Sequence, residues 1–262
     1  MGALRDGYVR MYADDEGSEF LGGASSIKWL EASVSLGPRR FFLLDGQWYE
    51  IDAHYLENHY ARVARILEAP PSLDLPAWSV TWAERDYNDW VPLNREGYVC
   101  LDRRSIRGGL HRRSGVEVCD LLGPGNELVH VKRAHGSAPL SHLFSQGLVA
   151  AEALLNSPDV RARFTAAVRE YGRGRTVPED FTPKKIVFAI LLKDGEHLSP
   201  ETLFPFSQVT LAHTARTLER QGIAVEVIGI NASASQSAPL ITARFPRAAP
   251  PYGATFAESL RR

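Results

Sequence analysis

The sequence predicts a mixed α/β fold in which helices cover both faces of one sheet. From Trp82 onward, helix-like and strand-like segments follow the order α-β-β-β-α-β-α-β. Three consecutive strands with short connections form a meander, whereas strands joined through helices form parallel crossovers. The chain has 262 residues, of which 44% are hydrophobic, so it can bury a full core.

The N-terminal third, residues 1–76, is expected to form a β-hairpin and helix region. Arg39–Leu44 and Gln47–Ile51 are strand-like runs that flank the hairpin turn Asp45-Gly46. Asp52 then suits the N-cap of a helix that runs to about Glu68. The proline-rich stretch 69–76 follows, and we place the domain boundary there.

Residues 77–231 carry the predicted core, and the Ser/Ala/Pro-rich stretch 232–262 is expected to be a tail. The predicted helices have apolar residues at helical spacing, and the predicted strands are short apolar runs. The expected helices are Trp82–Trp90 (a helix or an irregular segment), Pro139–Leu155, Pro158–Tyr171 and Phe206–Gln221. The expected strands are Gly97–Leu101, Val116–Leu122, Glu127–Arg133, Lys184–Leu192 and Ala224–Ile230.

Cellular location is indicated by three features of the sequence. Cys100 and Cys119 lie in apolar runs without the spacing of a metal site, so we expect reduced core residues. No signal-peptide pattern opens the chain, and no apolar run approaches the roughly 20 residues that span a bilayer. We therefore expect a cytoplasmic protein with no membrane partner.

One predicted hairpin brings three titratable residues together. Gly123-Pro124-Gly125-Asn126 is a turn sequence, with Asp120 before it and His130 and Lys132 after it. His130 and Lys132 must share one face of their strand, because side chains alternate. A loop with an odd number of residues pairs Asp120 with His130, and an even one turns the acid away. We predict the odd register or an equivalent bulge, and hence convergence of the three side chains.

This arrangement resembles the restriction-endonuclease-like nuclease superfamily. That superfamily has an αβββαβ core, with Asp at the end of the second strand and (Asp/Glu)-x-Lys on the third. The counterparts here are Asp120 and His130-Val131-Lys132, and the acid on the preceding helix is Glu84. The resemblance covers roughly Trp82–Leu192. It implies a restriction-endonuclease-like fold and an endonuclease that hydrolyses DNA, with RNA as a further option, in phage defence or a mobile element.

The resemblance also implies Mg²⁺ or Mn²⁺ as cofactor, with Asp120, Glu84 and His130 as the ligand set. Lys132 then orients or deprotonates the attacking water and offsets charge in the transition state. His130 departs from the usual Glu or Asp, and imidazole suits Mn²⁺ better than Mg²⁺. Three explanations stay open: a changed metal preference, a general-base role for His130, or a degenerate site.

Two other acidic or polar residues bear on the site. Glu117 is an odd number of residues from Asp120, so a regular strand sends it to the opposite face. Gln146 faces the site if its helix packs over the hairpin, and its position matches a Gln of related nucleases. We therefore count Gln146 among the candidate catalytic residues.

A basic stretch is the candidate nucleic-acid surface. Its arginines are either a DNA-backbone patch or an ordinary solvated loop, and the net charge of −1 favours neither reading. The candidate residues are Arg103, Arg104, Arg107, Arg112, Arg113 and, on the following strand, Arg133.

Over a longer stretch the chain resembles a sporadically distributed bacterial family of unknown function. The phrases that carry this resemblance are FFLLDGQWYEID, VEVCDLL, HVKR and PLSHLFSQG. In that family the region resembles the C-terminal half of a longer protein. The polar, weakly patterned start of this chain fits the same interpretation, so we expect an upstream domain.

Two alternatives to an active nuclease remain. One is a nuclease-fold module whose site has decayed and which serves nucleic-acid binding or assembly. The other treats His130-x-Lys132 as half of a phospholipase-D-like site, in which a His attacks phosphorus without metal. That pattern wants Asp at position 137, where this chain has Ser137, and it needs a second His-x-Lys. Two chains would then share one site as a homodimer.

Overall fold

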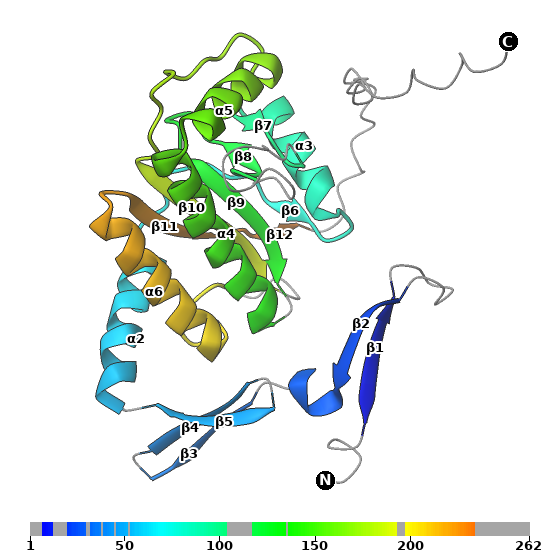
Figure 1. Ribbon diagram of the computed structural model, residues 1–262, viewed down its shortest axis with the longest axis vertical. Helices are drawn as coiled ribbons and strands as arrows, with labels where there is room; N and C mark the ends of the chain where they lie inside the picture. The colour runs from blue at the N-terminus through cyan, green and yellow to red at the C-terminus, as the bar shows by residue number, and fades with distance from the viewer. Residues whose placement is uncertain are drawn as a thin grey trace, which may run out of the picture.

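A five-stranded mixed sheet forms the centre of the protein (Figure 1). The computed structural model describes residues 7–12, 20–29, 32–37, 39–44, 46–51, 53–103, 117–134, 136–192 and 197–233. The strand order is β11-β10-β9-β8-β7. The strands are β7 (Val99–Cys100), β8 (Leu121–Leu122), β9 (Leu128–Ala134), β10 (Lys185–Leu192) and β11 (Ala224–Gly229).

The sheet changes direction at β9. β7, β8 and β9 form an antiparallel meander, whereas β9, β10 and β11 run parallel to one another. The parallel connections pass through α4 (Ser137–Asn156) and α5 (Pro158–Tyr171), and then through α6 (Pro205–Arg220). The prediction of a mixed α/β fold, with a meander followed by helical crossovers, is confirmed.

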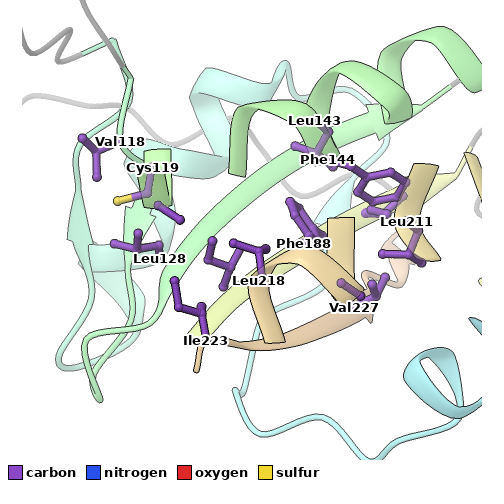
Figure 2. Close-up of a cluster of buried hydrophobic side chains, with 14 of the residues drawn as sticks. Val118, Cys119, Leu128, Leu143, Phe144, Phe188, Leu211, Leu218, Ile223 and Val227 are labelled. Atoms are coloured by element: carbon purple, nitrogen blue, oxygen red, sulfur yellow. The ribbon is translucent and has the colours of Figure 1, made fainter. Parts of the chain in front are cut away.

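The two faces of the sheet have separate cores. On one face Phe144 of α4 packs edge-on against Phe188 of β10, with ring centroids 5.0 Å apart (Figure 2). A Cβ at Gly147 would approach the Phe188 ring to 2.7 Å, so α4 can lie this close to β10 only with glycine there. On the other face Tyr87 of α3 (Glu84–Asn94) stacks on Trp78 at 4.6 Å. The interior strand β10, which is covered on both faces, is therefore apolar along nearly its whole length.

The N-terminal region contributes two small sheets and one helix. β1 (Tyr8–Tyr12) pairs with β2 (Phe20–Ser25), and the short 3-10 helix η1 (Ser26–Trp29) follows β2. A second, three-stranded sheet consists of β3 (Ala32–Leu36), β4 (Arg39–Leu44) and β5 (Gln47–Ile51). The predicted β4–β5 hairpin is confirmed in register. The helix α2 (Ala53–Leu67) follows, and the predicted N-cap Asp52 lies outside the described residues. Val63 and Ile66 of α2 belong to the same core as α4 and α6, while the boundary at residue 76 stays a prediction.

Two predicted elements differ from the structure. α3 begins at Glu84 and continues past Trp90 to Asn94, even though Pro92 lies within it. Only Leu121 and Leu122 of the expected strand Val116–Leu122 pair as a strand within the described residues. The remaining described residues of that stretch, 117–120, are irregular.

The chain ends, as far as it is described, beside α3. β12 (Ala232–Ser233) pairs in parallel with β6 (Trp78–Ser79), and residues 234–262 of the predicted tail lie outside the described residues. Within the described ranges, no helix combines the length and the apolar character that crossing a bilayer requires.

Candidate functional site

The β8–β9 hairpin has the predicted odd register. Leu121 pairs with Val129 and Leu122 with Leu128, which leaves a five-residue loop and places Asp120 opposite His130. Asn126 closes the loop in the left-handed region at a φ of 70°, a conformation that Asn tolerates better than most residues. The backbone register expected from the sequence is therefore confirmed.

Asp120 lies where β8 stops pairing with β9. Its N–H donates to the Val129 carbonyl at 3.0 Å, and its carbonyl accepts the Leu101 N–H at 2.8 Å. The next donor on β9 is the Val131 N–H, and it bonds to Asp120 Oδ2 at 2.6 Å. The carboxylate thus takes the place of a backbone carbonyl, which fixes it at the edge of β9.

Lys132 and Glu84 form an ion pair beside Asp120. The distance from Lys132 Nζ to Glu84 Oε2 is 3.0 Å, and Glu84 Oε1 accepts the Arg133 N–H at 3.2 Å. Glu84 is the first residue of α3, so its negative charge also faces the positive end of the helix dipole. The structure therefore brings Glu84, the helix acid that the resemblance implies, into contact with Lys132.

Two further carboxylates complete what we call the acidic cluster, Asp102, Glu117 and Asp120. One oxygen atom from each residue lies within 4.8 Å of the others. Asp102 follows β7, and Glu117 accepts the Arg103 N–H at 2.6 Å. The expectation that Glu117 lies on the face opposite Asp120 is wrong, because residues 117–119 do not form a regular strand and alternation does not apply.

The cluster, Glu84 and Lys132 line one cavity of about 190 Å³, here called the acidic cavity. Gln146 reaches it from α4, as expected, and Arg85, Arg103, Asn88 and Val131 complete the lining. Asn88 is 2% exposed, and its Oδ1 has no hydrogen-bond partner among the described residues. An adjacent cavity of about 210 Å³ shares Arg85, Asp102 and Arg103 with it.

The electrostatics of the acidic cavity are unusual at Asp120. Burial raises the pKa of Asp120 to about 8, and the carboxylates of Glu117, Asp102 and Glu84 act in the same direction. The hydrogen bond from Val131 opposes this shift but does not cancel it. Without added positive charge, this carboxyl group is therefore largely protonated at neutral pH.

The structure does not bring His130 to the acidic cavity, so the expected convergence of its side chain with Asp120 and Lys132 is wrong. The imidazole is 2% exposed and lies 5.9 Å from the Phe188 ring, under the layer that α4 forms. Within the described part of the chain its Nε2 has no hydrogen-bond partner, and burial lowers its pKa to about 4. His130 and Lys132 lie two residues apart on the same strand, but His130 is buried whereas Lys132 is only half-buried and lines the cavity.

The comparisons with known proteins identify a family. A model described as "Family of unknown function (DUF6119)" matches residues 1–231. This chain belongs to that family. No curated protein and no solved structure matches this chain. The family description gives no activity, so the function has to be inferred from the acidic cavity.

The candidate nucleic-acid residues divide into three groups. Arg103 lines both cavities, with its own backbone in the left-handed region at a φ of 60°. The Arg133 guanidinium donates to the Val80 and Ser79 carbonyls and lies 5.2 Å from the Trp78 ring, so contacts within the fold hold it. Arg104, Arg107, Arg112 and Arg113 lie outside the described residues.

Sequence reasoning missed Asp102 and Asn88. Asp102 had a usable signal, because an acid directly after a buried strand next to the Asp120 strand lies at the same sheet edge. Asn88 had none, because an Asn in an amphipathic helix gives no indication that its amide will be buried.

Proposed function

We propose that this protein is a metal-dependent nuclease that hydrolyses phosphodiester bonds in DNA. The observation that carries the proposal is the meeting of Asp120 and Lys132, from neighbouring strands, with Glu84 in one acidic cavity. Phosphodiester hydrolysis needs an activated water, charge stabilisation at phosphorus and a stabilised leaving oxygen. Carboxylates and a lysine in one cavity are suited to these three tasks.

The oxygen-rich lining fits Mg²⁺ or Mn²⁺, since both ions prefer carboxylate and carbonyl oxygens. When bound, such an ion supplies a Lewis acid that polarises the phosphoryl oxygen and lowers the pKa of water. Asp120, anchored by Val131, is the central ligand in this proposal. Lys132, oriented by Glu84, holds the attacking water and offsets the charge that develops on the phosphoryl oxygens.

The order of elements supports the same proposal. α3-β7-β8-β9-α4 followed by β10 is the αβββαβ order of the restriction-endonuclease-like superfamily, with an additional helix, α5, before β10. Asp120 stands just before the second of these strands, and Lys132 lies on the third. The chain departs from that superfamily at position 130, where the side chain is a buried imidazole rather than a carboxylate in the cavity.

DNA is the proposed partner, and its phosphates would be met by cationic side chains at the two cavities. Arg85 and Arg103 line both cavities, and Arg173 lines the larger one. Guanidinium groups bind phosphate oxygens in a bidentate manner. RNA offers the same phosphates and is a second substrate to test.

One observation favours a catalytically decayed binding module as the second candidate. Position 130 presents no ligand to the cavity, because its side chain lies in the core against Phe188. The same observation weighs against a phospholipase-D-like mechanism, in which the imidazole of His130 has to reach phosphorus.

A cleavage assay tests the proposal. Plasmid and single-stranded DNA are incubated with the protein in EDTA, Mg²⁺ or Mn²⁺, using wild type, Asp120→Ala and Lys132→Ala. We expect metal-dependent cleavage that falls at least about 100-fold in both variants. Lys184→Ala is the matched control, because this exposed lysine precedes β10 and lines neither cavity.

The other outcomes identify the alternatives. DNA binding without cleavage under any metal would overturn the nuclease and support the decayed module. Cleavage that persists in EDTA would point to a metal-independent phosphodiesterase.

A further inference from the structure

We infer that Asp102, Glu117 and Asp120, together with the amide oxygen of Asn88, form a divalent-cation site. The ligands come from the ends of β7 and β8 and from α3, rather than from position 130 on β9. The inference deepens the proposed function by naming its metal ligands, and only its catalytic meaning rests on that function.

The geometry of the acidic cluster suits a divalent ion. One carboxylate oxygen from each residue lies within 4.8 Å of the other two. Ligands on opposite sides of an ion are separated by twice the metal–oxygen distance, about 4.2 to 5 Å for Mg²⁺, Mn²⁺ or Ca²⁺. A single ion can therefore contact all three carboxylates with small side-chain adjustments.

Two of the carboxylates are already oriented by the backbone. Asp120 uses Oδ2 to accept from the Val131 N–H, and Glu117 uses Oε1 to accept from the Arg103 N–H. Each hydrogen bond fixes its carboxylate and leaves the second oxygen for another partner. Such outer hydrogen bonds are typical of protein metal ligands, since they hold the ligand in its binding orientation.

The charge of the cluster is not balanced by the described residues. Lys132 is paired with Glu84, and Arg85 is paired with Asp89 at 3.5 Å. Among the described residues, the three carboxylates of the cluster form no ion pair, although Arg85 and Arg103 line the same cavity. Three neighbouring carboxylates repel one another, and a bound divalent cation removes most of that repulsion.

Asn88 supplies an independent observation. Its side chain is 2% exposed and lines the acidic cavity, and no described residue forms a hydrogen bond with its Oδ1. A buried amide oxygen without a partner costs about 1–3 kcal/mol. An amide oxygen is also an ordinary ligand for Mg²⁺, Mn²⁺ and Ca²⁺, so a cation in the cavity satisfies this atom.

The position of His130 explains why the ligands come from elsewhere. Its side chain lies under α4, where an acid would be buried against Phe188. A carboxylate at position 130 would therefore not reach the acidic cavity. Asp102 and Glu117 reach it because β7 and β8 end beside Asp120.

Metal binding without DNA tests the inference. Mn²⁺ is titrated into the full chain and followed by calorimetry and by the electron-spin resonance of free Mn²⁺. We expect Asp102→Asn, Glu117→Gln and Asn88→Leu each to weaken Mn²⁺ binding at least about tenfold. Asp180→Asn, an exposed acid away from the cavity, is the matched control and should bind as wild type does.

One further measurement separates ligands from neighbours. His130→Leu should leave the Mn²⁺ affinity unchanged, because this side chain does not line the cavity.

The outcomes distinguish this inference from the nuclease proposal. No Mn²⁺ binding at millimolar concentration, or binding that Asp102→Asn and Glu117→Gln leave intact while both remain folded, overturns the cation site. Binding that these variants weaken, in a protein that does not cleave DNA, upholds the cation site and overturns only the nuclease.

Discussion

The buried carboxylate of Glu226 and the half-buried carboxylate of Asp120, at opposite parts of one sheet, have opposite environments. Glu226 on β11 accepts the Ser72 N–H at 2.6 Å and the Ser72 hydroxyl at 2.5 Å, and it pairs with Lys185 at 3.1 Å. Burial by itself would raise its pKa. The hydrogen bonds from Ser72 and the Lys185 ammonium outweigh burial and lower the pKa of Glu226 below its ordinary value.

Among the described residues, the Asp120 carboxylate accepts a hydrogen bond only from the Val131 N–H, and it has three acidic neighbours. Burial together with Glu117, Asp102 and Glu84 raises its pKa to about 8. Glu226 is a structural residue, because the fold itself supplies the groups that its charge needs. Asp120 lacks them, and a buried carboxylate whose countercharge the fold does not supply is typical of a functional site.

Neutralising Asp120 should give the largest stability change. In EDTA, the unfolded wild type ionises at this residue above about pH 4, while the folded protein holds the proton until about pH 8. Wild-type stability therefore falls as the pH rises through this window. Each pKa unit is worth about 1.4 kcal/mol, so a difference of about four units predicts that Asp120→Asn is about 5 kcal/mol more stable at pH 9.

Urea denaturation of both proteins from pH 4 to pH 9 measures this effect. The stability gain of Asp120→Asn should vanish near pH 4, where Asp120 of the wild type is protonated in both the folded and the unfolded protein. Added Mn²⁺ should stabilise wild type and leave Asp120→Asn nearly unchanged. An Asp120→Asn variant that is less stable than wild type at pH 9 would contradict the comparison.

Neutralising Glu226 should have the opposite sign. Glu226→Gln sets an amide NH₂ against the Ser72 donors and Lys185, so we expect a loss of about 2 kcal/mol at pH 7. Because the folded pKa of Glu226 is lowered, the wild-type advantage should shrink as the pH falls below about 4. The same denaturation series checks this, and unchanged Mn²⁺ affinity is the expected control result.

Replacing His130 should give the smallest change. His130→Leu removes the unpartnered Nε2 from the core, and we expect a gain of about 1 kcal/mol at pH 7. The buried imidazole has a pKa of about 4, so wild-type stability falls between pH 6.5 and pH 4, where only the unfolded chain takes up the proton. The stability gain of His130→Leu over wild type should therefore increase as the pH falls from 6.5 to 4.

The melting temperature of His130→Leu, measured between pH 4 and pH 7, tests this prediction. The activity of this variant in the cleavage assay should equal that of wild type. Loss of cleavage in a folded His130→Leu protein would restore the imidazole as a member of the site.

Much of the site was predictable because it depends on local rules. The turn chemistry of residues 123–126 indicates a hairpin, and side-chain alternation with an odd loop pairs Asp120 with His130, as observed. Helical spacing places Gln146 on a helix, and it was expected to face the site if that helix packs over the hairpin; it does line the cavity.

The sequence alone determined the mixed α/β order and the hairpin register, since these follow from period, turn type and element order. The meeting of Glu84 with Lys132 was expected from the resemblance to the nuclease superfamily. Only the tertiary structure decided that His130 is buried and that Glu117 joins Asp120. Alternation specifies the face on which a side chain lies, but not whether a helix covers that point of the face. α4 covers position 130, and the regular strand β8 begins only at Leu121, so Glu117 lies outside it. Long-range packing therefore determined which side chains reached the acidic cavity.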